Sequence, residues 1–372
     1  MSQTSYNNKS GPVSGRSVHV GLVAGRETLR NLGPVVRHMI VGLLDEPLPV
    51  TLFCPAKTDV ANIPAPPVQI IEYDTTRIPF LRRRAFDLIA QQVVQSGTSL
   101  LHALDIDAAS LTSRLAAEAG MDYVIGIYSL GRDVRSLDMH CRAVLAAGEP
   151  IRRRLLNSHI GPEGMVHLLR PGVHQAGEAT CFVDPAHSTA IVAGGELRDH
   201  KYFDSVLEVF ARLQKSRQDC VFFIVGNGPD EARLRRMAEK LGLTPNLTFV
   251  DRQSPDELKG ILRAADIFIS PVPSNRLDIE LLSAMAAGVP VIAAGAKVCD
   301  FVIPDETALT YRPGSASELA DKLAFLMNDH YAAERLAEKA LEYLRANHSP
   351  AKMAGQLIDL YYAVTKKKRP VG

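Results

Sequence analysis

The feature that most constrains the fold of this chain is a repeated alternation of short apolar runs with longer segments of helical period. In the first half, apolar runs of strand length lie at 18–23, 50–53, 68–73, 100–103, 123–127 and 166–169. Segments of helical period lie between them at 32–44, 80–96, 108–119 and 149–157. Apolar strands that alternate with helices are typical of a parallel sheet covered by helices. We therefore expect a doubly wound α/β domain here.

A second cycle of the same kind follows. Its apolar runs lie at 189–193, 220–225, 247–250, 267–270, 289–293 and 308–311, and helical segments close the chain at 317–328, 331–346 and 350–365. The stretch 170–185, with its Pro and Gly residues, suits a connection between domains. The sequence thus predicts a disordered leader at 1–16, an N-terminal domain at 17–185, a C-terminal domain at 186–349, and a C-terminal helix with a basic tail at 350–372. Two such sheets would form a cleft lined by the carboxyl ends of their strands.

Composition and charge exclude several classes of protein. Lys plus Arg number 42 and Asp plus Glu 41, so the net charge of +1 offers no general attraction for nucleic acid. The five cysteines are scattered, with no Cys/His cluster at metal spacing, which predicts reduced thiols and no metal site. No apolar run reaches the roughly 18–20 residues that span a bilayer, so we expect a cytoplasmic protein.

Strand exits in the second half carry the clearest local signals. Gly226 and Gly228 follow an apolar strand and precede a helix, which either brings backbone close to a ligand or forms only a tight turn. A helix at 279–287 follows another strand, and free N–H groups at its start favour a phosphate. Most helix starts, however, bind only water or a side-chain cap.

Lys201 opens the helix that follows the Gly194-Gly195 strand exit. A lysine at a helix start opposes the helix dipole unless an anion offsets it. Lys201 is therefore either a diphosphate contact or a solvated surface side chain.

Together these segments resemble the C-terminal domain of the family 4 glycosyltransferases, retaining enzymes of the GT-B fold that use nucleotide-diphosphate sugars. The most specific match is the stretch 283–292, Ser-Ala-Met-Ala-Ala-Gly-Val-Pro-Val-Ile. The segments 224–230, 168–174 and 313–319 are similar to the family's Gly-x-Gly-Pro turn, linker and late Pro-Gly turn. The resemblance covers most of the chain and implies two facing Rossmann-like doubly wound parallel-sheet domains. It also implies metal-independent transfer with no cofactor, because a lysine and a helix dipole can replace a cation at the diphosphate.

The sequence departs from the family pattern at the residues expected to do the chemistry. The family's two glutamates fall on Asn275 and Ser283, which can form hydrogen bonds but carry no charge. Its loop arginine falls on Gly195 and its N-terminal histidine on Tyr128. Its Gly-Gly loop after the first strand is reduced to Leu32-Gly33, whereas its lysine is kept as Lys201.

The resemblance implies a nucleotide-sugar site in the C-terminal domain. The expected catalytic residues are Asn275, facing the sugar, and Lys201, offsetting diphosphate charge. The expected binding residues are Gly194, Gly195, Lys201, Gly226, Gly228, Arg276, Leu277, Asp278, Ile279, Glu280 and Ser283.

Two acidic residues near the start of the 279–287 helix have opposite expected effects. Glu280 lies three positions before Ser283 and either reaches the ribose in its place or only complements the helix dipole. Asp278 lies in the loop expected to present backbone amides to the diphosphate, where its charge would repel that ligand.

The N-terminal domain offers acceptor-side candidates. These are Gly33, His102, Asp105 and Tyr128, of which His102 and Asp105 come at the end of an apolar strand. A lone histidine there is more often packed or capping than functional. The arginine triplets 82–84 and 152–154 lie on expected helices and are either solvated faces or sites for an anionic lipid or polyanionic acceptor.

Two functions follow. The first is transfer of a sugar from a nucleotide sugar to an unidentified glycan, lipid or small-molecule acceptor, with retention implied only by the resemblance. The second is a catalytically inactive GT-B relative that serves as a binding or scaffolding module, favoured by the altered positions. In either case we expect no nucleic-acid partner, and the basic end 366–369 leaves peripheral membrane contact open.

Overall fold

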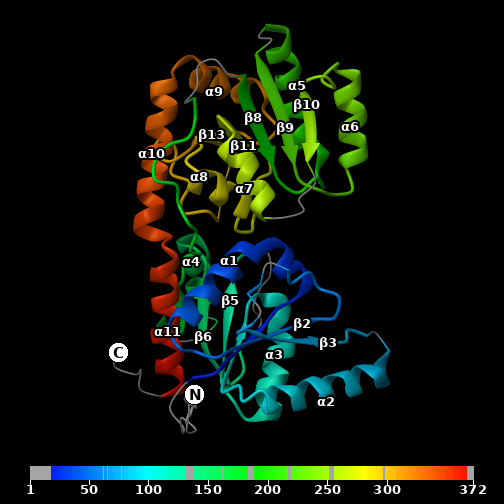
Figure 1. Ribbon diagram of the computed structural model, residues 1–372, viewed down its shortest axis with the longest axis vertical. Helices are drawn as coiled ribbons and strands as arrows, with labels where there is room; N and C mark the ends of the chain where they lie inside the picture. The colour runs from blue at the N-terminus through cyan, green and yellow to red at the C-terminus, as the bar shows by residue number, and fades with distance from the viewer. Residues whose placement is uncertain are drawn as a thin grey trace, which may run out of the picture.

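The protein folds into two α/β domains placed end to end, shown by the computed structural model in Figure 1. The structure describes residues 18–366, apart from 62, 65, 77, 131–136, 159, 161–162, 183–187, 217–218, 251–254 and 296–297. The predicted leader and most of the predicted basic tail lie outside these residues. Within the described part of the chain, no helix is long and apolar enough to cross a membrane.

The N-terminal sheet has seven parallel strands in the order β3-β2-β1-β4-β5-β6-β7. Its register follows the apolar runs, since Val20 of β1 lies opposite Val50 of β2 and Leu100 of β4. The central strands are buried throughout, as expected for a sheet covered on both faces. The strands are β1 (Val20–Val23), β2 (Val50–Pro55), β3 (Gln69–Tyr73), β4 (Leu100–Ala103), β5 (Tyr123–Ile127), β6 (Cys141–Ala146) and β7 (Val166–Leu168).

The C-terminal sheet has six parallel strands in the order β10-β9-β8-β11-β12-β13. The strands are β8 (Thr189–Gly194), β9 (Cys220–Val225), β10 (Leu247–Val250), β11 (Ile267–Ser270), β12 (Val291–Ala294) and β13 (Leu309–Tyr311). In each sheet the strand order reverses beside the first strand of the domain, between β1 and β4 and between β8 and β11. Ligands of doubly wound sheets bind at this switch point, outside the carboxyl ends of the strands.

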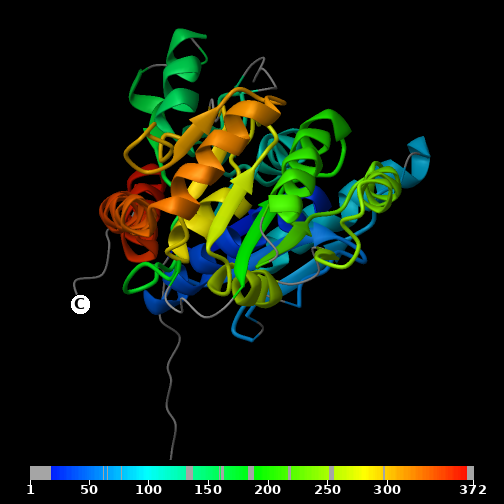
Figure 2. The same cartoon turned by 90° about the horizontal axis from the view of Figure 1, so that it is seen from above.

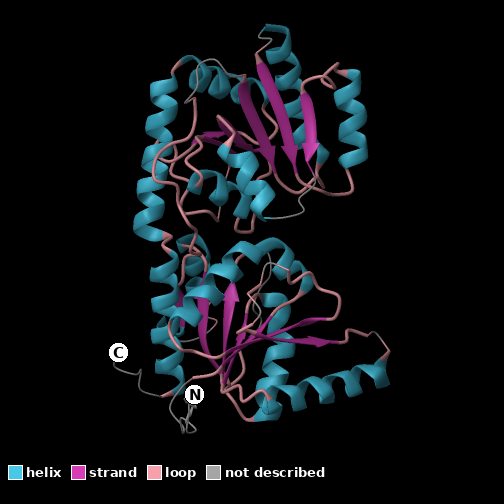
Figure 3. Ribbon diagram, in the orientation of Figure 1, coloured by secondary structure: helices cyan, strands magenta, loops and turns pink. Residues whose placement is uncertain are grey.

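Helices cover both faces of each sheet (Figure 3). They are α1 (Arg26–Asp45), α2 (Pro79–Gln95), α3 (Ile106–Ala119), α4 (Glu149–Asn157), α5 (His200–Ser216), α6 (Glu231–Lys240), α7 (Pro255–Arg263), α8 (Ile279–Ala286), α9 (Ala316–Asn328), α10 (His330–Asn347) and α11 (Pro350–Thr365). In Figure 1 the arrows of β8, β9 and β10 point toward the N-terminal domain, and β5 points toward the C-terminal domain. The carboxyl ends of the two sheets therefore face each other, as the sequence predicted.

The end of the chain returns to the N-terminal domain. Helix α10 runs along the C-terminal domain, and α11 continues below it beside α1 (Figure 1); in the view from above, α10 and α11 overlap at one side (Figure 2). Gly42 of α1 allows this packing, because a Cβ at that position would overlap the Cβ of Ala354 in α11. The predicted C-terminal helix thus completes the core of the other domain.

Two sequence-based element assignments were wrong. Strand β6 was not predicted, because the exposed Arg142 interrupts its apolar run after the first residue. Helix α1 begins at Arg26 rather than at 32, so Leu32 and Gly33 lie inside it and not in a loop after β1. The loop after β1 is formed by Ala24 and Gly25 instead.

The contact between α1 and α11 generates a stability prediction. Gly42→Ala should lower the free energy of unfolding by about 1–3 kcal/mol, because the backbone around Ala354 must move. Gly355→Ala, one residue further along α11 in open space, should instead raise it by about 0.5–1 kcal/mol through helix propensity. Urea unfolding of both variants checks this, and equal effects would contradict the packing described here.

Candidate functional site

Three strand exits of the C-terminal sheet meet at its switch point. A Cβ on Gly194, at the end of β8, would lie 2.7 Å from the ring of Phe268 in β11 and 3.7 Å from the Cβ of Glu280 in α8. A Cβ on Gly195 would lie 3.5 Å from Val272, which follows β11. The structure therefore brings the β8 exit together with the segment that leads from β11 into α8.

The glycines after β9 complete this arrangement. Gly226 has a φ of 153°, and a Cβ there would overlap the carbonyl of Gly195. A Cβ on Gly228 would overlap Leu197, whose N–H donates to the Asn227 carbonyl at 3.1 Å. These glycines let the β8 and β9 exit loops pack on one another, so their conformation is explained without a ligand.

The start of α8 is satisfied by its own N-cap. The Asp278 carboxylate accepts the Leu281 N–H at 2.9 Å and the Ser270 hydroxyl at 2.8 Å. Burial, with the charge of Asp278 a smaller contribution, raises the pKa of the neighbouring Cys299 thiol. Asp278 therefore points into the protein and occupies the anion position at the helix N-terminus.

Main chain from the N-terminal domain contacts the segment before α8. The Leu277 N–H donates to the Tyr128 carbonyl at 2.8 Å, and the Leu130 N–H donates to the Asn275 carbonyl at 2.7 Å. Ser129 and Arg276 thereby form an antiparallel β-bridge between the domains. We call the pairing of 128–130 with 275–277 the interdomain bridge. In this bridge the Leu277 N–H is already bonded to Tyr128, although the family resemblance implied that this amide contacts a diphosphate.

The two motif positions lie in different surroundings. Asn275 is an exposed residue in the interdomain bridge, and Ser283 is half-buried one turn into α8. Glu280, 8% exposed, is buried at the β8 exit beside Gly194. A carboxylate is thus present at this edge of the sheet, three residues before the position where the family carries one.

Lys201 lies in the first turn of α5, where its Nζ is 3.1 Å from the Asp199 carboxylate. The hydrogen bond to Asp199 raises the pKa of Lys201, and its side chain remains 61% exposed. The His200 N–H donates to the Asp230 carboxylate at 3.0 Å, so a second acidic group complements this helix start. The carboxylates of Asp199 and Asp230 therefore supply negative charge at the start of α5, where the sequence alone allowed either a bound diphosphate or solvent.

Two of the acceptor-side candidates lie inside secondary-structure elements. Gly33 is inside α1. His102 is inside β4 and fully buried, and its Nδ1 shares a hydrogen bond of 2.6 Å with the Tyr361 hydroxyl of α11. Burial lowers the pKa of His102 to about 3, so it stays neutral at physiological pH. His102 therefore holds α11 against the sheet, in agreement with the packed alternative considered from the sequence.

The other two acceptor-side candidates lie at strand exits. Asp105 follows β4, and its carboxylate caps α3 by accepting the Ile106 N–H at 2.7 Å. Tyr128 follows β5 and is buried; burial and the nearby Asp105 charge raise the pKa of its hydroxyl. Through its carbonyl in the interdomain bridge, Tyr128 is joined to the C-terminal domain.

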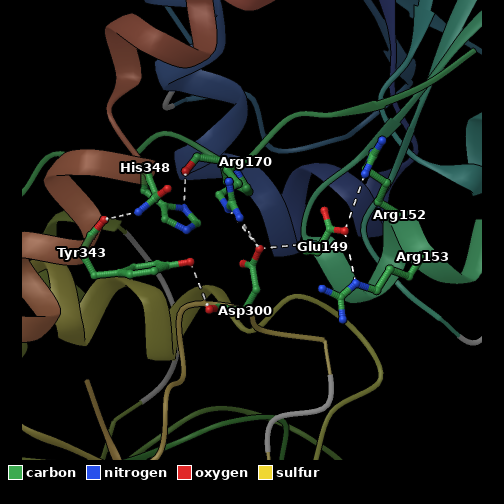
Figure 4. A network of polar contacts seen from close by, with 9 residues as sticks. Glu149, Arg152, Arg153, Arg170, Asp300, Tyr343 and His348 are labelled. Carbon is green, nitrogen blue, oxygen red and sulfur yellow. Dashed lines mark hydrogen bonds and ion pairs between the residues drawn. The ribbon is translucent and has the colours of Figure 1, made fainter. Parts of the chain in front are cut away.

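Sequence reasoning missed a polar network that joins the domains (Figure 4). The Asp300 carboxylate, in the loop after β12, accepts Nε of Arg170 at 2.9 Å and the Glu149 N–H that begins α4 at 3.0 Å. The Tyr343 hydroxyl of α10 donates to the Asp300 carbonyl at 3.1 Å. His348 donates from Nδ1 to the Pro171 carbonyl at 2.8 Å. No local sequence signal marks such long-range pairs.

No group of three His, Cys, Asp or Glu side chains among the described residues is arranged to hold a metal ion. The five cysteines are free and buried.

Comparison with known proteins agrees with this architecture. Residues 185–343 match the family described as Glycosyl transferases group 1. The chain is 31% identical over 213 residues to the D-inositol 3-phosphate glycosyltransferase of Corynebacterium glutamicum (strain R), covering 55% of this chain and 51% of that protein. It is 27% identical over 176 residues to the 2-deoxystreptamine glucosyltransferase of Streptomyces kanamyceticus, covering 47% of this chain and 46% of that protein. The chain thus spans about half the length of the curated relatives it matches.

Solved structures share the whole fold. A glycosyltransferase from Rickettsia africae ESF-5 superposes with a TM-score of 0.73 at 16% identity, covering 95% of this chain and all of the other. HepE of Anabaena, solved in complex with UDP and glucose, gives a TM-score of 0.73 at 13% identity over 93% of this chain and 100% of that chain. The two facing parallel-sheet domains are therefore the GT-B fold.

The buried His102 predicts a pH dependence of stability. Its folded pKa lies below the unfolded value, so the unfolded chain binds an extra proton between about pH 6.5 and 3. The stabilisation is complete above pH 6.5 and is lost as the pH falls, by up to about 1.4 kcal/mol per pH unit. Urea unfolding at pH 7, 6 and 5 should show this acid limb, and His102→Leu/Tyr361→Phe should make it less steep; His348, whose pKa burial lowers to about 4, accounts for part of the remainder. Parallel profiles for the two proteins would exclude His102 as the cause.

Proposed function

We propose that this protein, whose residues 185–343 belong to the group 1 glycosyltransferases, transfers a glycosyl group from a nucleotide-diphosphate sugar to an acceptor held against its N-terminal domain. The supporting observation is the convergence of the β8, β9 and β11 exits at the switch point, on the side that faces the other domain. The HepE structure, which carries UDP and glucose on the same fold, supports a nucleotide-sugar donor.

In this proposal, the residues have the following roles. Glu280 accepts hydrogen bonds from the ribose at the β8 exit, with Ser283 beside it one turn along α8. Lys201 leaves Asp199 and offsets diphosphate charge, and the amide of Leu277 contacts the diphosphate. Asn275 faces the sugar. These assignments need the interdomain bridge to open, because the Tyr128 carbonyl holds the Leu277 N–H.

In this proposal, the neutral amide dipole of Asn275 takes the place of the carboxylate in the family motif. A neutral amide at Asn275 stabilises developing positive charge less than a carboxylate, because charge-assisted hydrogen bonds are roughly twice as strong. Retention of configuration belongs to the proposal and rests on the likeness of 283–292 to family 4. The acceptor in this proposal is a glycan, a lipid or a small molecule.

The donor site is tested by ligand-dependent stabilisation. Thermal unfolding with UDP, GDP, ADP and their sugar conjugates should show stabilisation by one nucleotide class, about 2.7 kcal/mol at 100 times its Kd. Lys201→Ala and Glu280→Gln should each weaken this binding about tenfold, as expected for loss of one charged contact worth ~1.5 kcal/mol. Arg198→Ala, which removes another exposed, ion-paired cation of the same loop, is the matched control and should change little. If none of the nucleotides stabilises the protein at millimolar concentration, the proposal is rejected.

A second function is favoured by the interdomain bridge itself. With Leu277 engaged by Tyr128 and α8 capped by Asp278, the anion position of this domain is filled by the protein. A GT-B scaffold held closed in this way would serve as a binding module without transferring sugar.

Weakening the interdomain bridge separates these two functions. Leu130→Pro removes the N–H that donates to Asn275, a bond worth about 1 kcal/mol, so a competing donor should bind about fivefold more tightly. Leu130→Ala keeps the N–H and is the control. Calorimetric titration of both variants with UDP, GDP, ADP and their sugar conjugates measures the effect. If the transferase proposal holds, only the proline variant gains affinity; in a scaffold, neither variant binds a donor.

A further inference from the structure

Two histidines meet where the N-terminal domain contacts the connection at 170–185. The rings of His38, in α1, and His174, in the connection, lie edge to face with their centroids 4.5 Å apart. Nδ1 of His38 donates to the Gly172 carbonyl at 3.0 Å, so this is the nitrogen that carries the proton in the neutral ring. Nε2 of the same ring bonds no described residue, and protonation would make it a second donor.

Basic side chains from both domains lie near this pair. Arg37 precedes His38 in α1, and Lys259 belongs to α7, on the side of the C-terminal domain that faces α1 (Figure 1). Burial lowers the pKa of His38, and the charges of His174, Arg37 and Lys259 lower it further. Both domains and the connection between them thus bring positive charge to one place.

No described carboxylate neutralises these cations by direct contact. The side chains of Arg37, His174 and Lys259 are exposed and form no hydrogen bond or ion pair with a described residue. Arg30, two turns earlier in α1, is instead paired with Glu27 at 2.7 Å. Like charges that meet between two domains oppose the contact unless an anion joins them.

We propose that the junction cluster, defined as Arg37, His38, His174 and Lys259, binds a phosphate-type oxyanion between the two domains. The guanidinium of Arg37 and the ammonium of Lys259 form charge-assisted hydrogen bonds to the anion, and His38 donates from Nε2 once it is protonated. The junction cluster shares no residue with the proposed donor site, so this inference stands independently of the transferase proposal.

Binding at the junction cluster is linked to protonation. A nearby anion favours the charged form of an imidazole and therefore raises its pKa. The burial and neighbouring cations that lower the pKa of His38 in the free protein are then opposed by the bound charge. The complex takes up a proton as it forms, so its affinity increases as the pH falls.

A metal ion fits this place less well than an oxyanion. Imidazoles are common metal ligands, but no group of three His, Cys, Asp or Glu side chains among the described residues is arranged to hold a metal. The charges of Arg37 and Lys259 would also repel a divalent cation. Both side chains are usual ligands of phosphate groups in proteins.

The test is calorimetric titration of the full-length protein with sodium sulfate at pH 6, 7 and 8, with sodium chloride added to keep the ionic strength constant. Sulfate stays a dianion over this range, so a pH dependence comes from the protein. The affinity should rise about tenfold from pH 7 to pH 6, as expected for about one proton taken up per anion. Titrations in buffers of different ionisation enthalpy measure that proton directly.

Substitutions in each part of the junction cluster test its composition. Arg37→Gln in the N-terminal domain and Lys259→Gln in the C-terminal domain should each weaken sulfate binding about tenfold, through loss of one charge-assisted hydrogen bond. The double variant H38Q/H174Q should remove the pH dependence. Because Arg37 and Lys259 are exposed, their variants keep the test decisive even where the double variant folds poorly.

Matched controls make the result specific to the junction cluster. Arg236→Gln in α6 and Lys339→Gln in α10 remove exposed cations that form no ion pair with a described residue, and Lys201→Ala removes the cation of the proposed donor site. All three variants should bind sulfate like the unaltered protein. Titrations with inorganic phosphate and with glycerol 2-phosphate then distinguish a free ion from a phosphate ester by which binds more tightly.

The proposal is overturned by any of five outcomes. Sulfate does not bind at pH 6 at millimolar concentration; its affinity is the same at pH 6 and pH 8; the Arg236 and Lys339 controls weaken binding as much as the cluster variants, which would show an adventitious ion only; Lys201→Ala abolishes binding, which would assign the sulfate to the donor site; or zinc binds in place of sulfate and H38Q/H174Q abolishes that binding.

Discussion

The Asp300 carboxylate is the interaction on which the relation between the two domains depends. It belongs to the C-terminal domain, yet it binds Arg170 of the connection and caps α4 of the N-terminal domain. The Asp300 side chain is only 12% exposed and that of Arg170 22%, so solvent screens the pair weakly. Removing one member would leave the other as an uncompensated charge in a site largely removed from water.

The surroundings of Asp300 show why the chain crosses between domains at this point. Gly148 allows the close approach of this loop, since a Cβ there would lie 3.1 Å from the Val298 carbonyl oxygen and 3.4 Å from Oδ1 of Asp300. Tyr343 and His348 attach the end of α10 to the same region, and His348 packs edge-on against Phe301 at 5.5 Å. The connection at 170–171 and the turn from α10 to α11 thus lie together, and two chain crossings share one set of contacts.

Whether a feature could be predicted from the sequence depends on how far apart along the chain its interacting residues lie. The strands at 100–103, 123–127, 220–225 and 267–270 were placed correctly, because their apolar runs are local and need only a covered sheet. The GT-B fold was predicted from the resemblance together with this alternation. His102 was considered both as an acceptor-side residue and as a packed histidine; the structure shows it packed, but its partner, Tyr361, is 259 residues away and could not be named from the sequence. No local pattern reports such a contact.

Asp278 shows how a correct local argument can still miss the role of a residue. Its negative charge at the start of α8 was expected to repel a diphosphate, and that electrostatic argument stands. The structure adds that the same carboxylate holds Leu281 and Ser270, so the charge stabilises the helix that a donor would approach. A capping role was weighed for helix starts in general, but the sequence did not show that Asp278 provides it.

The two interdomain contacts differ in kind, and this difference indicates how the molecule opens. The interdomain bridge consists of two neutral main-chain hydrogen bonds, each worth about 1 kcal/mol net because water can replace them. The Asp300 contacts are charge-assisted and mostly shielded, so separating them leaves charges that water reaches poorly. Separation at the bridge therefore costs less free energy than separation at Asp300. A rotation about the Asp300 region would free Asn275 and Leu277 while the crossings of the chain stay fixed, and the proposed transferase function would need such a motion for donor entry.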